Sequence, residues 1–254
     1  MTVAAGPGPE QPPVRGLPAQ LAFGLLLGAV VLAQVAAQPS HPFSVAYSFL
    51  QQNSDGTPYR WNPCEPIRYV VNPDGAPDGA MGDVRNAMRR VSAQTGIPFV
   101  SDGVTDEIPV AGRSAYQPER YGFRWAPLLI GWIHDEESDI PLHYPRVGAG
   151  FPIAVRNALG RPVYVSGWLA LNADLAPGTL EGESLASIVQ HELGHVVGLG
   201  HVHSPQQIMF PTAAEEAQTD WGPGDRLGLF LVGSADGCID EPVPSAAVTQ
   251  LGPA

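Results

Sequence analysis

The run from His191 to His201 constrains this chain of 254 residues more than any other segment. It reads HELGHVVGLGH, which fits the pattern H-E-x-x-H-x-x-G-x-x-H. Apolar residues recur at three- and four-residue steps from Leu185 to Val197, and this periodicity predicts an amphipathic helix. His191 and His195 are four residues apart, so they lie one turn apart on the same face of that helix. Two imidazole nitrogens can therefore bind one metal ion.

Gly198 sets the end of this helix. Glycine takes the left-handed conformation without a Cβ clash, so the chain can leave the helix sharply there. The turn brings His201 back toward His191 and His195, where it can supply a third nitrogen ligand. Glu192 is offset by about 100° around the helix from His191, which points its carboxylate beside the metal. The run therefore predicts a zinc site with three histidine ligands and an adjacent acid–base residue.

The sequence around this run resembles the metzincin clan of zinc endopeptidases. The resemblance rests on the histidine run and on the turn Ile208–Pro211, which places Met209 soon after the third histidine. Ser204 and the Met-x-Pro form of the turn are most similar to the matrixin-like branch. The motif spans residues 191–211, and the order of the expected elements extends the resemblance over residues 59–233.

The resemblance implies a role for each residue of the motif. The three histidines hold one catalytic zinc ion, and Glu192 acts as general base and then as general acid. Met209 forms the floor beneath the imidazoles, while Gly198 and Pro211 shape the site. Zinc lowers the pKa of its bound water to about 7, so the implied activity is hydrolysis of peptide bonds in a peptide or protein.

The chain departs from the family pattern after the turn begins. Phe210 follows Met209 where several relatives have tyrosine, so it offers no hydroxyl to an oxyanion. Small residues at 212–214 replace an aromatic that is common beside the pocket for the residue after the cleaved bond. The cysteine-switch segment of the family is not evident. His203 is interpreted as a polar loop residue rather than a substrate contact or a further ligand, because three ligands complete a catalytic zinc site.

Several classes of function fit these residues. An exported zinc endopeptidase is the first hypothesis, and a catalytically weak or inactive zinc-binding module of the same fold is the alternative. A zinc hydrolase that cleaves a non-peptide amide is a third reading. Glu192 favours catalysis, because a degenerate site commonly loses its general base.

Charge and the N-terminal segment bear on partners and location. The chain has 13 basic and 25 acidic residues, which gives a formal net charge of −12. Nucleic acid is therefore not an expected partner. The protein is expected to be a monomer. Residues 1–37 are interpreted as a signal peptide cleaved after Ala37. The apolar stretch Leu17–Ala37 is also close to the roughly 20 residues that span a bilayer, so an uncleaved anchor is the alternative. Either reading places the catalytic domain outside the cytoplasm, secreted or membrane-anchored.

Cys64 and Cys238 are the two cysteines of the chain. In an exported protein such a pair is most simply one disulfide. It would join the segment before the first strand to the segment after the last helix. The alternative makes Cys64 a thiol that caps the zinc, which would leave Cys238 unpaired.

The pattern along the chain predicts an α+β, metzincin-like catalytic domain over residues 59–238. An extended lead-in at 38–58 precedes it, and a disordered Pro/Ala-rich tail at 239–254 follows it. A twisted mixed sheet with packed helices is expected above the zinc cleft, with the Met-turn and the last helix as a small subdomain below. Strands are expected at 67–71, 97–100, 128–133, 147–155 and 163–171, and helices near 84–96, 183–198 and 227–233.

Two further segments carry functional expectations. The strand at 147–155 is expected at a sheet edge, where an extended peptide would add as another strand. The acidic segment 134–145 contains His134 and His143. The matrixin resemblance suggests calcium or a second zinc near it, but no spacing matches a defined metal loop, so a solvated surface loop is the favoured interpretation.

Overall fold

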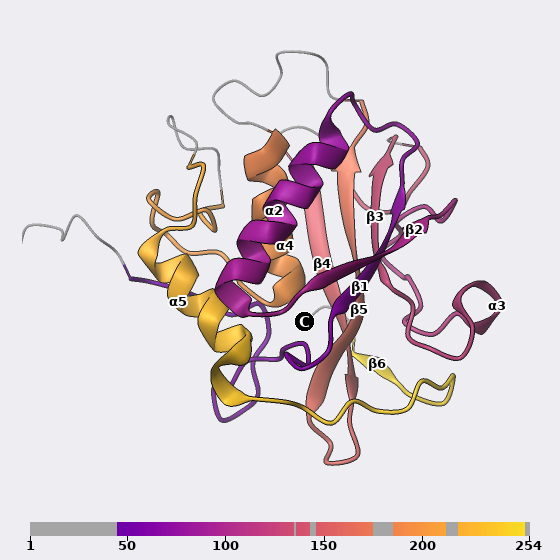
Figure 1. Cartoon of the computed structure of the whole chain (residues 1–254), viewed down its shortest axis with the longest axis vertical. Helices are drawn as coiled ribbons and strands as arrows, with labels where there is room; N and C mark the ends of the chain where they lie inside the picture. Colours follow the sequence, from indigo (N-terminus) through magenta and orange to yellow (C-terminus); the bar gives the residue numbers. More distant parts are fainter. Residues whose placement is uncertain (1–44, 135, 143–145, 175–184, 212–217, 252–254) are drawn as a thin grey trace, which may run out of the picture. The chain divides into compact units, whose positions relative to one another are not determined.

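The computed structural model describes residues 45–134, 136–142, 146–174, 185–211 and 218–251. Its centre is a mixed six-stranded sheet of order β2-β1-β3-β5-β4-β6 (Figure 1). β1, β2, β3 and β5 are parallel, whereas β4 is antiparallel to both of its neighbours. The strands are β1 (Ile67–Asn72), β2 (Phe99–Val104), β3 (Leu128–Ile133), β4 (Gly148–Arg156), β5 (Pro162–Asn172) and β6 (Gln250–Leu251).

Helices cover one face of this sheet (Figure 1). α2 (Ala80–Thr95) packs beside α4 (Leu185–Val197), and α4 also contacts β4. α5 (Pro223–Val232) packs against α2, and η1 (Ser234–Asp236) follows it. The short α3 (Pro118–Tyr121) lies apart from these helices. The expected α+β class with a mixed sheet is confirmed.

Both faces of the sheet are buried. One apolar cluster lies between the sheet and the helices and includes Val84, Leu169 and Leu193. A second cluster lies on the opposite face and includes Leu129 and Val163. All residues of β3 are therefore buried, which explains why its sequence is continuously apolar rather than alternating.

The two cysteines are joined. Cys64 and Cys238 form a disulfide across a sequence separation of 174 residues. The Asn62 side-chain oxygen accepts hydrogen bonds from the backbone N–H of Cys64 at 3.2 Å and of Ile239 at 3.1 Å, so the two segments are also held beside the disulfide. The predicted disulfide is confirmed, and the alternative of a zinc-capping thiol is wrong because the Cys64 sulfur is bonded to Cys238.

The C-terminal segment lies along the sheet, so the expectation of disorder is wrong for residues 239–251. β6 pairs with the Ala154–Val155 end of β4. Ile239 and Val248 pack against the core cluster on the face away from α4. Composition suggested disorder because proline and alanine are frequent, but composition does not reveal that a strand edge and an apolar sheet face are available to these residues.

The described part of the lead-in contacts the turn after α4. The backbone N–H of Leu50 donates to Gly198 O, and that of Gly200 donates to Ser48 O, both at 2.8 Å. Residues 45–58 therefore support the loop that carries His201.

Several expectations fall on residues outside those that the structure describes. They are the export segment 1–37, the first part of the lead-in, the first residues of the helix expected from 183, the small residues 212–214, and the end of the tail at 252–254. Among the described residues, no helix is both long and apolar enough to cross a membrane.

Removing the disulfide should destabilise the fold strongly. Replacing both cysteines (Cys64→Ser with Cys238→Ser) frees the unfolded chain from a long cross-link, which should lower the free energy of unfolding by about 4–5 kcal/mol in the chain-entropy model. Urea denaturation measures this difference, and wild-type protein unfolded with a reductant should match the double variant. A loss below about 1 kcal/mol would contradict the expected role of the cross-link.

Candidate metal centre

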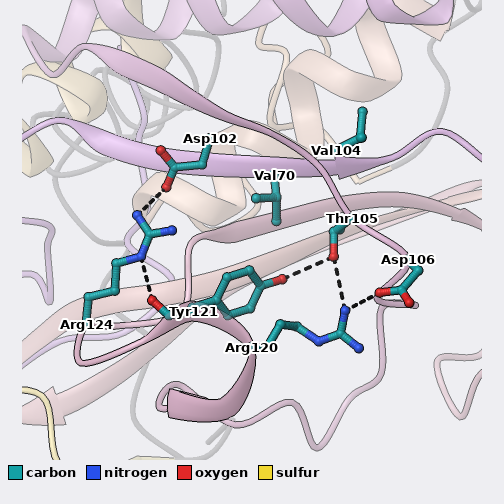
Figure 2. Close-up of a pocket in the computed structure, with 8 residues that line it drawn as sticks. All are labelled: Val70, Asp102, Val104, Thr105, Asp106, Arg120, Tyr121 and Arg124. Carbon is teal, nitrogen blue, oxygen red and sulfur yellow. Dashed lines mark hydrogen bonds and ion pairs between the residues drawn. The ribbon is translucent and has the colours of Figure 1, made fainter.

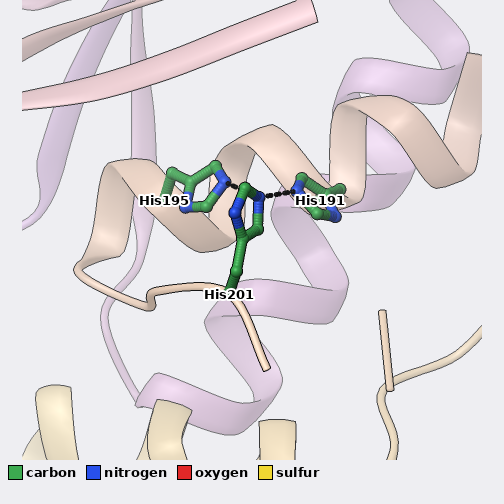
Figure 3. A group of neighbouring side chains, drawn as sticks. All are labelled: His191, His195 and His201. Carbon is green, nitrogen blue, oxygen red and sulfur yellow. Dashed lines mark hydrogen bonds between the residues drawn. The ribbon is translucent and has the colours of Figure 1, made fainter. Parts of the chain in front are cut away.

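Three histidine side chains converge beside the C-terminal half of α4 (Figure 3). His191 and His195 extend from the helix, and His201 reaches back from the loop that follows it. The Nε2 atom of His201 lies 3.2 Å from that of His191 and 3.1 Å from that of His195. Nitrogen ligands at about 2.0–2.1 Å from a tetrahedral zinc ion lie about 3.3 Å apart. The three nitrogens thus already have a spacing that suits zinc.

Backbone carbonyls orient two of the imidazoles. His191 Nδ1 donates to Ile208 O at 2.7 Å, and His195 Nδ1 donates to Leu199 O at 2.8 Å. A neutral imidazole that donates through Nδ1 has an unprotonated Nε2. Two Nε2 lone pairs therefore face His201, which can donate only one proton between them. A cation placed among the three nitrogens satisfies all of them, so the residues present fit a zinc ion.

Loss of hydration favours the neutral form of these imidazoles. Desolvation lowers the pKa of His191 to about 4, even though its hydrogen bond to Ile208 opposes the shift. Desolvation, with a further effect of the neighbouring His191, lowers the pKa of His195 to about 3. Desolvation also lowers the pKa of His201, and the positive charge of nearby Arg146 lowers it further. All three side chains are thus in the unprotonated form that metal binding requires at neutral pH.

A sharp turn after α4 returns the chain to the metal site. Gly198 has a φ of +112°, and a Cβ atom there would lie 3.2 Å from both the Tyr164 ring and the Tyr59 carbonyl oxygen. The backbone N–H of Leu199 then donates to Gly194 O at 2.9 Å, while Leu199 O accepts the His195 proton. Positive φ and the lack of space both favour glycine here.

Met209 lies directly beneath the helix. Its side chain is buried, and a Cβ atom on Gly194 would lie only 2.4 Å from the Met209 sulfur. Met209 O accepts a hydrogen bond from Val202 N at 2.9 Å, which ties the turn to the loop of His201. Pro211 is exposed at the end of this turn. The need for glycine at 194 was not recognised from the sequence.

Asp225 in α5 holds the turn in place and was also missed. Its buried carboxylate accepts hydrogen bonds from the backbone N–H groups of Ile208 at 2.6 Å, Gly222 at 3.1 Å and Met209 at 3.4 Å. Burial raises the pKa of Asp225, while these backbone bonds oppose that shift. Because Ile208 O accepts the His191 proton, this carboxylate indirectly orients a candidate ligand.

A sequence signal for Asp225 does exist. It is the third residue of a helix that begins after Gly222 with Pro223, and an acidic residue at that position commonly closes a capping box. The signal indicates a helix start. It does not indicate that the same carboxylate also bonds to a turn 16 or 17 residues earlier in the chain.

Glu192 packs against β4. It is mostly buried, and a Cβ atom on Gly148 would lie 3.0 Å from its Cγ and 3.3 Å from its Oε1. A Cβ atom on Gly150 would lie 2.2 Å from the Glu192 carbonyl oxygen. Two glycines thus allow β4 to approach the helix closely at the residue that follows the first candidate ligand.

The other candidate metal-binding residues lie apart from this cluster. Within the part of the chain that the structure describes, the one group of three or more ligand side chains is His191, His195 and His201. His203 is exposed and is not a member of it. In the acidic segment, His134 Nδ1 lies 2.6 Å from an Asp174 carboxylate oxygen, and residues 135 and 143 lie outside the described residues.

A hollow near β1, β2 and α3 contains charged side chains that pair with one another (Figure 2). Arg124 donates to Asp102 at 2.7 Å, and Arg120 pairs with Asp106. Val70 in its lining belongs to the core cluster on the sheet face away from α4. These ion pairs explain the charges without a ligand, so the metal centre is the better candidate for function.

Comparison with known proteins bears on the same segment. Residues 131–229 match the family model described as matrixin. This range begins within β3, ends within α5, and contains the three histidines, Glu192 and Met209. None of the curated proteins matches the chain.

Changing Asp225 should disturb both the fold and metal binding. Asp225→Asn replaces one accepting carboxylate oxygen with an NH2 group, which cannot accept, and this should lower the free energy of unfolding by about 1–3 kcal/mol. Zinc affinity should fall by about 10–100-fold, as for other groups that orient ligands. Urea denaturation and competitive zinc titration measure the two effects.

Asp220→Asn is the matched control. This neighbouring carboxylate is exposed and pairs with Arg226 at 3.2 Å on the surface, so its loss should change stability by no more than about 0.5 kcal/mol. Equal effects of the two substitutions would contradict the role assigned to Asp225.

Proposed function

We propose that this chain is a zinc endopeptidase that hydrolyses peptides or proteins outside the cytoplasm, because residues 131–229 match the matrixin family model. The convergence of three Nε2 atoms is the observation that carries this proposal, because His191 and His195 donate their Nδ1 protons to backbone carbonyls and leave Nε2 unprotonated. Such a set of lone pairs binds a cation, and the glutamate next to His191 supplies a base beside it.

In the proposed reaction, the metal and the protein side chains have different roles. When bound by His191, His195 and His201, zinc would activate a water molecule and polarise the carbonyl of the scissile bond. Glu192 accepts the proton of the attacking water and later donates it to the leaving amine. Met209 and the turn beneath α4 keep the three imidazoles in place. Phe210 supplies no hydroxyl, so oxyanion stabilisation does not involve that side chain.

The edge of β4 supports a peptide substrate rather than a small amide. β5 pairs with one side of β4 along its length, and Gly148 at the start of β4 packs against Glu192. An extended peptide added on the free side would form main-chain hydrogen bonds and bring a peptide bond to the metal. A small amide would not use such an edge.

Location outside the cytoplasm is supported by the Cys64–Cys238 disulfide, because such bonds persist in oxidising compartments. Residues 1–37 are proposed as the export segment, with membrane anchoring as the alternative. An inactive zinc-binding module of the same fold is the competing function, and substitution of Glu192 distinguishes the two.

Glu192→Ala should retain zinc and lose nearly all hydrolysis. No metal ligand is removed, but loss of the acid–base group should lower kcat/KM by about 10²–10⁴-fold. Cleavage of a peptide library, with zinc content measured on the same samples, tests this. Glu119→Ala, at an exposed position of α3, is the control and should cleave like wild type. Cleavage by Glu192→Ala at the wild-type rate would exclude the mechanism.

Loss of a residue that only orients a metal ligand weakens zinc binding by roughly 10–100-fold. His201→Ala should weaken it by more than this, because a direct ligand is removed. His203→Ala is the matched control, since it removes an exposed imidazole two residues away and should leave the affinity within about twofold. Zinc titration against a competing chelator measures both. Unchanged affinity in His201→Ala would remove this residue from the ligand set.

A further inference from the structure

β4 has one edge that is only partly covered. β5 pairs with it from Gly148 to Arg156, whereas β6 on the other side pairs with Ala154 and Val155 alone. In the described ranges of the chain, no other strand or bridge pairs with the outer edge from Gly148 to Ile153. This open edge therefore extends from the start of β4 to the residue before β6 begins to pair.

The open edge begins at the metal centre. Gly148 lies against the Glu192 side chain, and Gly150 lies against the Glu192 backbone and Val196. A peptide that pairs with the open edge would therefore reach the metal centre where the edge begins, at Gly148. The opposite end of the edge leads away from the site toward β6.

The direction of β6 matches that of an added peptide. β6 is antiparallel to β4, with Gln250 opposite Val155 and Leu251 opposite Ala154, so it runs toward the metal centre. A peptide that pairs antiparallel with the open edge would run in the same direction on the same side of β4. Its upstream end would then run into the segment that contains β6, because both occupy one line of hydrogen-bonding positions.

Side-chain contacts keep β6 in this position. The Gln250 side chain accepts from Ala115 N at 2.6 Å and donates to Arg113 O at 3.1 Å. Arg113 is itself buried, pairs with Glu107 and donates to Gly167 O in β5. Leu251 packs against the core cluster on the α4 face. A peptide could extend further upstream only by displacing these contacts.

We propose that β6 is the upstream limit of the substrate-binding edge and so determines how many residues before the cleaved bond the enzyme recognises. The proposal rests on the proposed peptidase function. The open edge spans about 20 Å at roughly 3.3 Å per residue, which leaves space for about six extended residues upstream of the cleaved bond. Residues further upstream must leave the sheet.

The test is a set of nested truncations assayed with a peptide series. The peptides share one cleaved sequence and carry roughly two to ten residues upstream of it. The chains end at Leu251, Gln250 or Thr249 and are compared with the full chain. The chain that ends at Leu251 retains β6 and is the control. The chain that ends at Gln250 loses Leu251 but keeps the Gln250 side-chain contacts, so it keeps the anchor of the segment.

In the full chain and in the control, kcat/KM should rise with upstream length to about six residues and then level off or fall. The limit should move by about one residue in the chain that ends at Gln250 and by about two in the chain that ends at Thr249. The same limit in all four chains would overturn the proposal while leaving the peptidase function intact. No chelator-sensitive cleavage of any peptide by the full chain would instead overturn the peptidase function, and the upstream limit with it.

Discussion

Two hydrogen bonds from imidazole Nδ1 atoms to backbone carbonyls are the constraint on which the site depends. They direct the Nε2 lone pairs of His191 and His195 toward His201. Each acceptor carbonyl is held by a different part of the fold. Ile208 is positioned by the Asp225 carboxylate of α5, and Leu199 follows the sharp turn at Gly198. The metal centre is thus assembled by a helix, a turn and a second helix.

Close packing at three glycines holds α4, which carries His191 and His195, against the sheet. Glycines at 148 and 150 let β4 lie directly against α4 at Glu192, and Gly194 on the helix makes room for Met209 below. The helix is therefore confined between a strand and a turn, with little freedom to shift. The strand that contacts Glu192 also has the outer edge with which β6 pairs, so the proposed substrate-binding edge lies on the strand that packs against the candidate metal centre.

Elements with a strong local pattern could be predicted, and elements that depend on distant contacts could not. β3 and α4 were predicted because their apolar residues are continuous or periodic. The disulfide was predicted because export was expected and two cysteines allow one pairing within the chain. Asp225 was missed because its partners lie in a separate turn. The tail was wrongly predicted as disordered because β6 exists only where β4 offers an edge.

The chemistry expected of the candidate site could be predicted from the sequence, because ligand type and helical spacing are local properties of residues 191–201. The α+β class could be predicted too, because the hydrophobic periods of helices and strands are visible without knowledge of their packing. The folded structure was needed to see what orients the imidazoles, how closely β4 approaches Glu192, and where β6 pairs with β4. Those features arise between segments far apart in the chain, and local sequence patterns carry no information about which distant backbone groups will meet.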